Sequence, residues 1–263
     1  MVYETNGQHL ATFLRDHHLG GSGAAWTQMA IALVPTGRAE IWVDAVREMT
    51  ALHLTRRLVC AGVVIVGRRG EFDAVAERAV QQLVLDTMIV DYFVVGDLMR
   101  RLEPAIRSAR RTISPTVRRE LEGFTRREMP YCYLCGTDLT FDDAGPTSFT
   151  IDHVWPRAYG GDSEPENLLP ACRSCNNRKG LTPSWSLYPV QALVAGFELE
   201  HSDIMEMPKE MRFAVQSRAA AAHAAATSVS LKEAFVNLGR PDLPTVIDIS
   251  VSVDVFNLDF AAK

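Results

Sequence analysis

The sequence predicts an α+β protein in which a small cysteine-rich module lies between two larger regions. Residues 1–98 mix helix-like and strand-like patterns, so we expect an accessory region of mixed α/β structure there. Residues 129–185 hold two Cys-x-x-Cys pairs around a pattern of strand, turn, strand and helix. Residues 99–128 are expected to form a basic helical connector, and residues 186–263 a mainly helical region that ends in a strand.

The composition is that of a globular protein. With 263 residues, of which 47% are hydrophobic and 22% charged, the chain can bury one large core or two smaller ones. Apolar runs such as Leu58–Gly67 are shorter than the ~18 residues that a membrane-spanning helix needs. The first residues do not have the pattern of a secretory signal. We therefore expect a cytoplasmic protein without a membrane segment.

Helices and strands are both expected in the accessory region. Ala39–Leu54 and Glu71–Leu85 have the periodicity of helices. The run Cys60–Gly67 is apolar and rich in valine, which favours a buried strand, and Met88–Val95 fits either a strand or a helix. Cys60 would then be a buried and chemically inert thiol.

The connector carries a strong local charge in a chain whose net charge is −5. Between Arg100 and Arg127 there are nine arginines and three glutamates, a local balance of +6. Such a surface can follow a nucleic-acid backbone, or it is a solvated helix face. The arginines nearest to the first cysteine pair are the candidates for backbone contact: Arg118, Arg119, Arg126 and Arg127.

The two cysteine pairs, Cys132/Cys135 and Cys172/Cys175, have the spacing of a structural zinc site. Two residues between cysteines let both thiolates reach one ion, and two such pairs complete a closed tetrahedral site. The 36 residues between Cys135 and Cys172 exceed the roughly 15–20 that are usual in a compact zinc ribbon, so a sizeable segment is inserted. Two disulfides are the alternative, but the lack of a secretory signal favours zinc.

The inserted segment has its own order of elements. Thr150–Val154 alternates polar and apolar residues and predicts a short strand, and Gly160–Asp162 predicts a turn. A second strand is expected near Asn167–Leu169. The helix that follows, Cys172–Gly180, would end at its terminal glycine.

With these elements in order, residues 131–182 resemble the HNH endonuclease family, also called ββα-metal or His-Me finger nucleases, in the variant held together by zinc on four cysteines. The resemblance covers roughly 50 of the 263 residues. The matching segments are Cys132–Cys135, Ile151–Pro156, Gly160-Gly161, Glu166–Pro170 and Cys172–Gly180.

The resemblance implies roles for four polar residues. His153 would be the general base, since a neutral imidazole can accept a proton from an attacking water near pH 7. Asp152 and Asn176 would bind a catalytic Mg²⁺ or Mn²⁺ ion, because carboxylate and amide oxygens suit hard cations. The family name suggests histidine where this chain has Asn176, and Asn177 is an alternative ligand. Asn167 would orient His153 by tying the loop between the strands, or it is a plain turn residue.

Three basic residues of the module lie where they could hold the phosphates that flank the scissile bond: Arg157, Arg178 and Lys179. Arg178 and Lys179 could equally be a solvated helix end. The resemblance thus predicts a metal-dependent endonuclease acting on nucleic acid, with DNA favoured and a role in restriction or antiviral defence. The rival functions are an RNA-cleaving toxin and a catalytically idle zinc module that binds nucleic acid or protein.

The C-terminal region is expected to be helical over Met205–Asn237. The segment Ile247–Val255 then alternates apolar and polar residues, as a half-buried strand does. This strand would pair with the N-terminal region of the same chain, or by edge addition with another protein or a second copy. Attached domains in this family usually choose the target, which gives residues 1–98 a role in specificity or partner binding.

Overall fold

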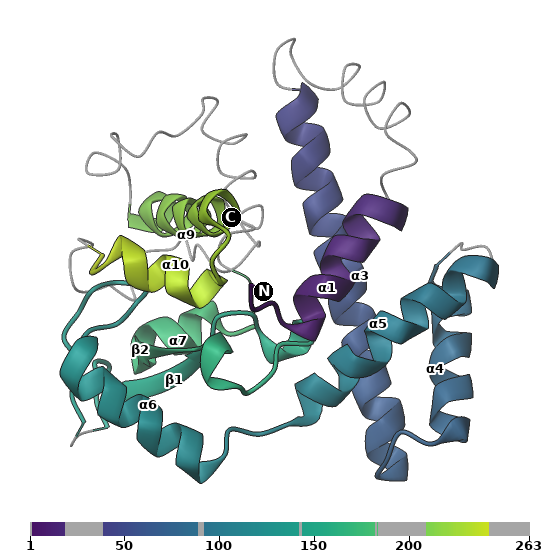
Figure 1. Cartoon of the computed structure of the whole chain (residues 1–263), viewed down its shortest axis with the longest axis horizontal. Coiled ribbons are helices and arrows are strands. Elements are labelled where there is room, and N and C mark those ends of the chain that lie inside the picture. Colours follow the sequence, from purple (N-terminus) through teal and green to yellow (C-terminus); the bar gives the residue numbers. More distant parts are fainter. Residues whose placement is uncertain are drawn as a thin grey trace, which may run out of the picture. The chain divides into compact units, whose positions relative to one another are not determined.

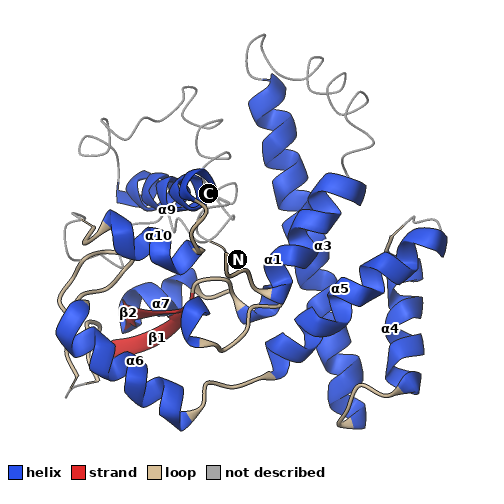
Figure 2. Cartoon of the chain, viewed as in Figure 1, coloured by secondary structure: helices blue, strands red, loops and turns tan. Residues whose placement is uncertain are grey.

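The computed structural model describes residues 2–18, 39–88, 92–141, 144–181, 183 and 209–241. In this part of the chain helices predominate, and two short strands form one sheet (Figure 2). The chain divides into two compact units. We call Glu4–Thr112 together with Trp155–Ser163 the helical unit. The cysteine unit is Met1–Tyr3, Ile113–Val154 and Glu164–Lys263. The boundaries predicted after residues 98, 128 and 185 remain predictions.

The helical unit is an assembly of packed helices with a helical turn from the loop between the strands (Figure 1). Its elements are α1 (Asn6–Phe13), η1 (Leu14–His18), α3 (Ala39–Arg69), α4 (Ala74–Thr87), α5 (Tyr92–Arg110) and η3 (Arg157–Tyr159). Thr5 caps α1, since its Oγ1 accepts from the amide of Gln8 at 3.1 Å while the Gln8 side chain accepts from the Thr5 amide at 2.8 Å. The core between the helices includes the fully buried side chains of Leu10, Leu58, Val80, Leu102 and Ile106.

The N-terminal region departs from the sequence-based expectation at α3. The segment Cys60–Gly67, predicted as a strand, is helical, and Cys60 is exposed rather than buried. A short apolar run does not distinguish a strand from a buried helix. Here Leu58, Gly62 and Val66 are buried at intervals of four residues, which is the spacing of one helix face. The mixed α/β structure expected for residues 1–98 is therefore wrong for the described residues, which form helices.

The other elements expected before residue 98 are present as helices. α3 includes Ala39–Leu54, and α4 covers most of Glu71–Leu85, as predicted. Of the ambiguous run Met88–Val95, the part from Tyr92 onward belongs to α5, and residues 89–91 lie outside the described residues.

One stretch of α3 has the length and composition of a membrane span. It runs from Val46 to Arg69 and has a mean hydropathy of 1.5. A core helix of a globular protein meets the same criterion, and α3 contributes Ala51, Leu58 and Val59 to the buried core described above.

The cysteine unit is built on an antiparallel strand pair followed by a short helix. β1 (Phe149–His153) pairs with β2 (Leu168–Cys172), and α7 (Arg173–Lys179) follows directly. In the register, Phe149 lies opposite Cys172 and His153 opposite Leu168. The predicted order of strand, turn, strand and helix is present, and the combination of this sheet with the surrounding helices is compatible with the α+β class.

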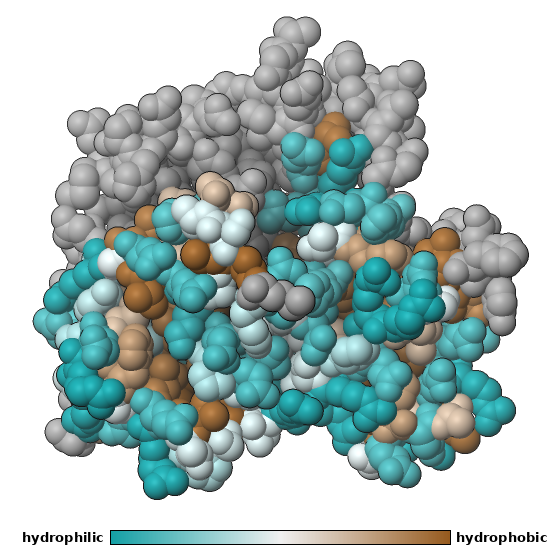
Figure 3. All heavy atoms as spheres, viewed as in Figure 1, coloured by the Kyte–Doolittle hydropathy of each residue, from teal (hydrophilic) through white to brown (hydrophobic). Residues whose placement is uncertain are grey.

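The remaining elements of the cysteine unit are helical. They are α6 (Pro115–Glu128), η4 (Pro165–Asn167), α9 (Lys209–Thr227) and α10 (Leu231–Leu238). α9 falls within the helical stretch predicted for Met205–Asn237, and α10 extends one residue beyond it. The strand predicted over Ile247–Val255 lies outside the described residues. On the described part of the face in Figure 3, hydrophobic side chains are interspersed with hydrophilic ones, as on ordinary protein surfaces.

Candidate active site and metal centre

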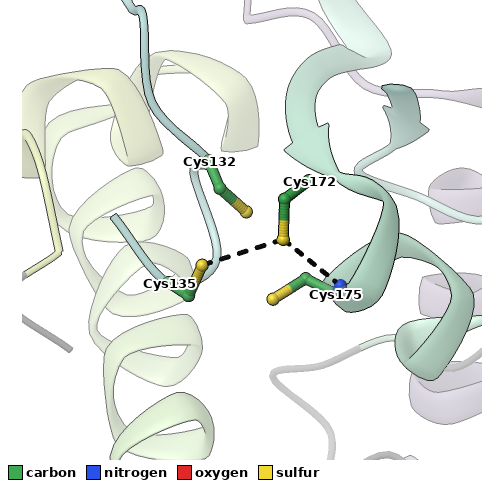
Figure 4. A group of neighbouring side chains, drawn as sticks. All are labelled: Cys132, Cys135, Cys172 and Cys175. Carbon is green, nitrogen blue, oxygen red and sulfur yellow. Dashed lines mark hydrogen bonds between the residues drawn. The ribbon is translucent and has the colours of Figure 1, made fainter. Parts of the chain in front are cut away.

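Four cysteine thiols come together in the cysteine unit. Cys132 and Cys135 precede β1, while Cys172 ends β2 and Cys175 lies in α7 (Figure 4). All four are buried, and their sulfur atoms lie within 4.8 Å of one another. The sulfurs of Cys135 and Cys172 are 3.9 Å apart. Two thiolates on one tetrahedral zinc ion, each about 2.3 Å from the metal, would be about 3.8 Å apart.

The chemistry of these four thiols fits a closed structural metal site. None of the chain's five cysteines, all of which are described, forms a disulfide. Burial raises the pKa of the Cys132 thiol well above its usual value, while hydrogen bonds from neighbouring cysteines lower the pKa of Cys135. Buried thiols this close together can all deprotonate only if a cation compensates their charge. The cluster therefore supports a structural metal rather than two disulfides.

Asp152 is held by two other side chains inside the unit. The Lys179 Nζ of α7 lies 2.8 Å from Oδ2 of Asp152 and also donates to the carbonyl oxygen of His153 at 2.8 Å. The hydroxyl of Tyr133 donates to the same Oδ2 at 2.5 Å. Burial and the negative charge of Asp152 raise the pKa of Tyr133 well above its usual value, so Tyr133 stays a donor. A carboxylate has about four acceptor positions, so a metal ion at Asp152 would share it with these partners.

His153 and Asn167 lie at the end of the strand pair where the loop connects the two strands. His153 is the last residue of β1 and is partly exposed, while Asn167 is 3% exposed. The carbonyl oxygen of Asn167 accepts from the amide of Val154 at 2.9 Å, so it closes the loop directly after His153. This placement agrees with an indirect, orienting role for Asn167. The catalytic roles of both residues remain predictions.

Asn176 is held against β1. Its Nδ2 donates to Oγ1 of Thr150 at 3.0 Å and to the carbonyl oxygen of Ile151 at 3.2 Å. An asparagine binds a hard cation through Oδ1. Both of these hydrogen bonds use Nδ2, so neither occupies the oxygen that would bind the ion. Asn177 is exposed. Of the two candidate ligands, Asn176 is therefore the one that contacts β1, at Thr150 and Ile151.

The predicted phosphate contacts have different surroundings. Arg118, Arg119, Arg126 and Arg127 are exposed on α6. Of these, Arg126 pairs with Glu122 at 2.8 Å and lies over the ring of Phe141 at 3.8 Å. Arg178 is partly exposed, whereas Lys179 is fully buried and is not the solvated helix end that one interpretation expected. Contact of these residues with phosphate remains a prediction.

Arg157 belongs to the helical unit, not to the surface of the strand pair. Its Nε and Nη2 both donate to the carbonyl oxygen of Ala109, at 3.1 and 2.7 Å. Ala109 lies in the last turn of α5, where carbonyl groups have no partner within the helix. The residue predicted to hold phosphate thus has an internal partner.

Sequence reasoning missed the internal roles of Tyr133 and Lys179. The helical spacing of Cys172, Cys175 and Lys179, at intervals of three and four residues, could have indicated that Lys179 lies on the same inward face as the cysteines. Nothing in the Cys-Tyr-Leu-Cys segment indicates which side chain Tyr133 would meet, because that contact spans 19 residues.

The strand pair, the helix after it and the Asp-His pair at the end of β1 follow one another in the order expected for a nuclease module of the ββα type. Residues 132–181 match the family described as HNH endonuclease, so this part of the chain is an HNH endonuclease domain. The resemblance inferred from the sequence is thereby confirmed, and it supports nuclease activity.

One relative is a much longer protein. A stretch of 59 residues is 37% identical to CRISPR-associated endonuclease Cas9 from Corynebacterium diphtheriae. The match covers 22% of this chain and 5% of that protein, so it concerns the HNH region alone. No solved structure matches this chain significantly.

Proposed function

We propose that this protein is a metal-dependent endonuclease that hydrolyses phosphodiester bonds in DNA. One observation carries the proposal: within the HNH domain, β1 presents Asp152 and His153 while α7 holds Asn176 against the same strand. A module that only binds nucleic acid or protein has no need for this combination of base and ligands.

His153 is the general base of the proposed reaction. An imidazole nitrogen accepts a proton from the attacking water, and the partial exposure of His153 lets water reach it. Asp152 and Asn176 hold a Mg²⁺ or Mn²⁺ ion through their oxygen atoms. When bound, such an ion supplies charge neutralisation at the phosphate and the leaving oxygen. Asn167 keeps the loop after His153 closed.

The four cysteines hold a structural zinc ion in this proposal. A site with four thiolates has no open position for a substrate. The role of the zinc ion is structural, because it joins the segment that carries Tyr133 to α7, which carries Lys179. Both of these residues contact Asp152. Zinc thereby keeps the proposed catalytic carboxylate in place.

The proposed setting is restriction or antiviral defence in the cytoplasm. The support is the Corynebacterium relative, which is a CRISPR-associated endonuclease. The exposed arginines of α6, with Arg178, would contact the DNA backbone. In the predicted domain division, residues 129–185 carry the nuclease and residues 1–98 serve specificity or partner binding.

Cleavage assays test the proposal directly. Purified protein and a His153→Ala variant are incubated with plasmid DNA, single-stranded DNA and RNA, each with Mg²⁺, Mn²⁺ or EDTA. We expect cleavage of DNA by the unmodified protein with either metal, and none with EDTA or by the variant. Cleavage of RNA alone would indicate a toxin-like ribonuclease. Binding without cleavage under every condition would indicate an idle module.

A further inference from the structure

We propose that the helical unit holds the loop between β1 and β2, residues Trp155–Ser163, and thereby positions His153 for catalysis. Gly7 and Arg157 are the positioning residues. The inference rests on the proposed function, because it concerns the base of the same site. It gives the N-terminal helices a part in the chemical step in addition to any part in target choice.

The closest contact joins α1 to the loop. The amide of Gly7 donates to the carbonyl oxygen of Gly160 at 3.1 Å. A Cβ atom on Gly7 would lie 2.0 Å from the carbonyl oxygen of Tyr159 and 2.4 Å from Nε1 of Trp155. Gly160 has a φ of +83°, and a Cβ there would lie 2.7 Å from the side chain of Ala105. Two backbones approach so closely only because neither glycine has a side chain.

The C-terminal end of α5 provides the second contact. The guanidinium of Arg157 donates twice to the carbonyl oxygen of Ala109. The hydroxyl of Ser163 donates to the carbonyl oxygen of Arg111 at 3.0 Å. Helix ends leave such carbonyl groups without partners, and a cation there also interacts favourably with the helix dipole. Arg157, near the start of the loop, and Ser163, its last residue, are therefore attached to the last turn of α5 and to the residue that follows it.

The third contact comes from α3, and an internal bond stiffens the loop. The thiol of Cys60 donates to the carbonyl oxygen of Ala158 over 3.6 Å. The indole of Trp155 donates to the carbonyl oxygen of Tyr159 at 2.9 Å, and this indole is buried. Three helices from separate parts of the N-terminal sequence thus each hold a different residue of the same loop.

The loop begins two residues after the proposed base. His153 is followed by Val154, whose amide is fixed by Asn167, and then by Trp155, the first loop residue of the helical unit. If the loop lost its contacts with the helical unit, the bond from Val154 to Asn167 would still hold the chain after His153. The residues that follow, from Trp155 onward, would then be able to move. Displacing a reacting group by about 1 Å can lower a rate by about 10²-fold, so the loop contacts should be visible in kcat.

Three variants test the inference, with a matched control. Gly7→Ala inserts a methyl group against the loop backbone, and Arg157→Gln removes the guanidinium from the end of α5. Arg157→Lys keeps the positive charge but replaces the planar guanidinium, whose two nitrogens both donate to Ala109, by a single ammonium group. Gly96→Ala, also in the helical unit, is the control, because a Cβ atom there meets no atom within 4 Å. Hydrogen exchange of residues 155–163, zinc content, kcat, KM and the salt dependence of DNA binding are measured for each.

We expect Gly7→Ala and Arg157→Gln to increase exchange in the loop and to lower kcat by about 10- to 100-fold, with KM changed by less than about twofold and zinc retained. Arg157→Lys should recover part of the loss, and Gly96→Ala should match the unmodified protein. If Gly7→Ala does not fold, the two Arg157 variants still decide the question.

Two results would overturn the inference. One is faster loop exchange with an unchanged kcat. The other is a raised KM and a flatter salt dependence for Arg157→Gln, with unchanged loop exchange, which would make Arg157 a phosphate contact instead. If the unmodified protein cleaves no substrate, the proposed function fails, while hydrogen exchange still reports whether the helical unit holds the loop.

Discussion

The ammonium group of Lys179 lies 2.8 Å from the carboxylate of Asp152, and the two side chains are 0% and 4% exposed. The same ammonium donates to the carbonyl oxygen of His153. Two buried charges are tolerated as a pair, because either one alone would bear the full cost of leaving water. The pair therefore fastens α7 to β1 at the two residues expected to carry out the chemistry.

Replacing Lys179 by methionine is expected to destabilise the cysteine unit by about 3–5 kcal/mol, because Asp152 would be left as an unpaired buried carboxylate. The denaturant midpoint at saturating zinc measures this loss. Adding Asp152→Asn to the variant should recover part of it, since a neutral amide needs no counterion. A midpoint equal to that of the unmodified protein would contradict the buried ion pair.

His153→Ala is expected to lower the cleavage rate by about 10²- to 10⁴-fold, the usual cost of losing a general base. Zinc content and the Kd for DNA should stay close to those of the unmodified protein, because the fold rests on the cysteine cluster and not on this imidazole. Single-turnover cleavage and a binding isotherm separate the two effects. Unmodified turnover would remove His153 from the mechanism.

Adjacent asparagines offer a matched test of the metal ligand. Asn176→Ala should lose cleavage in Mg²⁺, with partial recovery at high Mn²⁺, because a neutral ligand contributes less than a carboxylate. Asn177→Ala should cleave normally, because that side chain is exposed. Metal titrations of the cleavage rate compare the variants. The reverse pattern would assign the ligand to Asn177.

Cys132→Ser and Cys172→Ser are expected to fail by local unfolding, since binding a structural metal is part of the folding free energy of such modules. The loss of about one zinc ion per chain, with protease sensitivity between residues 131 and 180, is the expected result. Cys60→Ser is the control, because Cys60 lies outside the cluster. Full zinc retention in both cluster variants would disprove the site.

Features defined by short-range patterns were predictable from the sequence. The cysteine spacing predicted the cluster, and the alternation in Thr150–Val154 predicted β1. The strand predicted for Cys60–Gly67 was wrong, because an apolar run rich in valine also fits a helix that buries one face, as α3 does through Leu58, Gly62 and Val66. The neighbours that decide between the two structures are distant in sequence. The expectation of a buried Cys60 failed with it.

Contacts made over long distances in the chain were not predictable. Arg157 follows the segment Ile151–Pro156 directly, which suggested a phosphate contact, yet its partner is the carbonyl of Ala109, 48 residues earlier. Lys179 has a charge suited to phosphate, and its burial depends on Asp152, 27 residues away. In both cases the residue type fitted two roles, and only its position in the folded chain distinguishes them.

The exposed arginines of α6 are expected to provide sequence-independent affinity for DNA. Replacing Arg118, Arg119 and Arg127 by glutamine should weaken binding to all sequences alike, and each lost phosphate contact should lower the slope of log affinity against log salt by about 1. Arg126→Gln alone should have a smaller effect, because its guanidinium already pairs with Glu122 and lies over Phe141. Binding isotherms across a salt series measure both variants. An unchanged slope in the triple variant would mean that this face of α6 is solvated or contacts protein, and the DNA path would then have to lie nearer to Arg178.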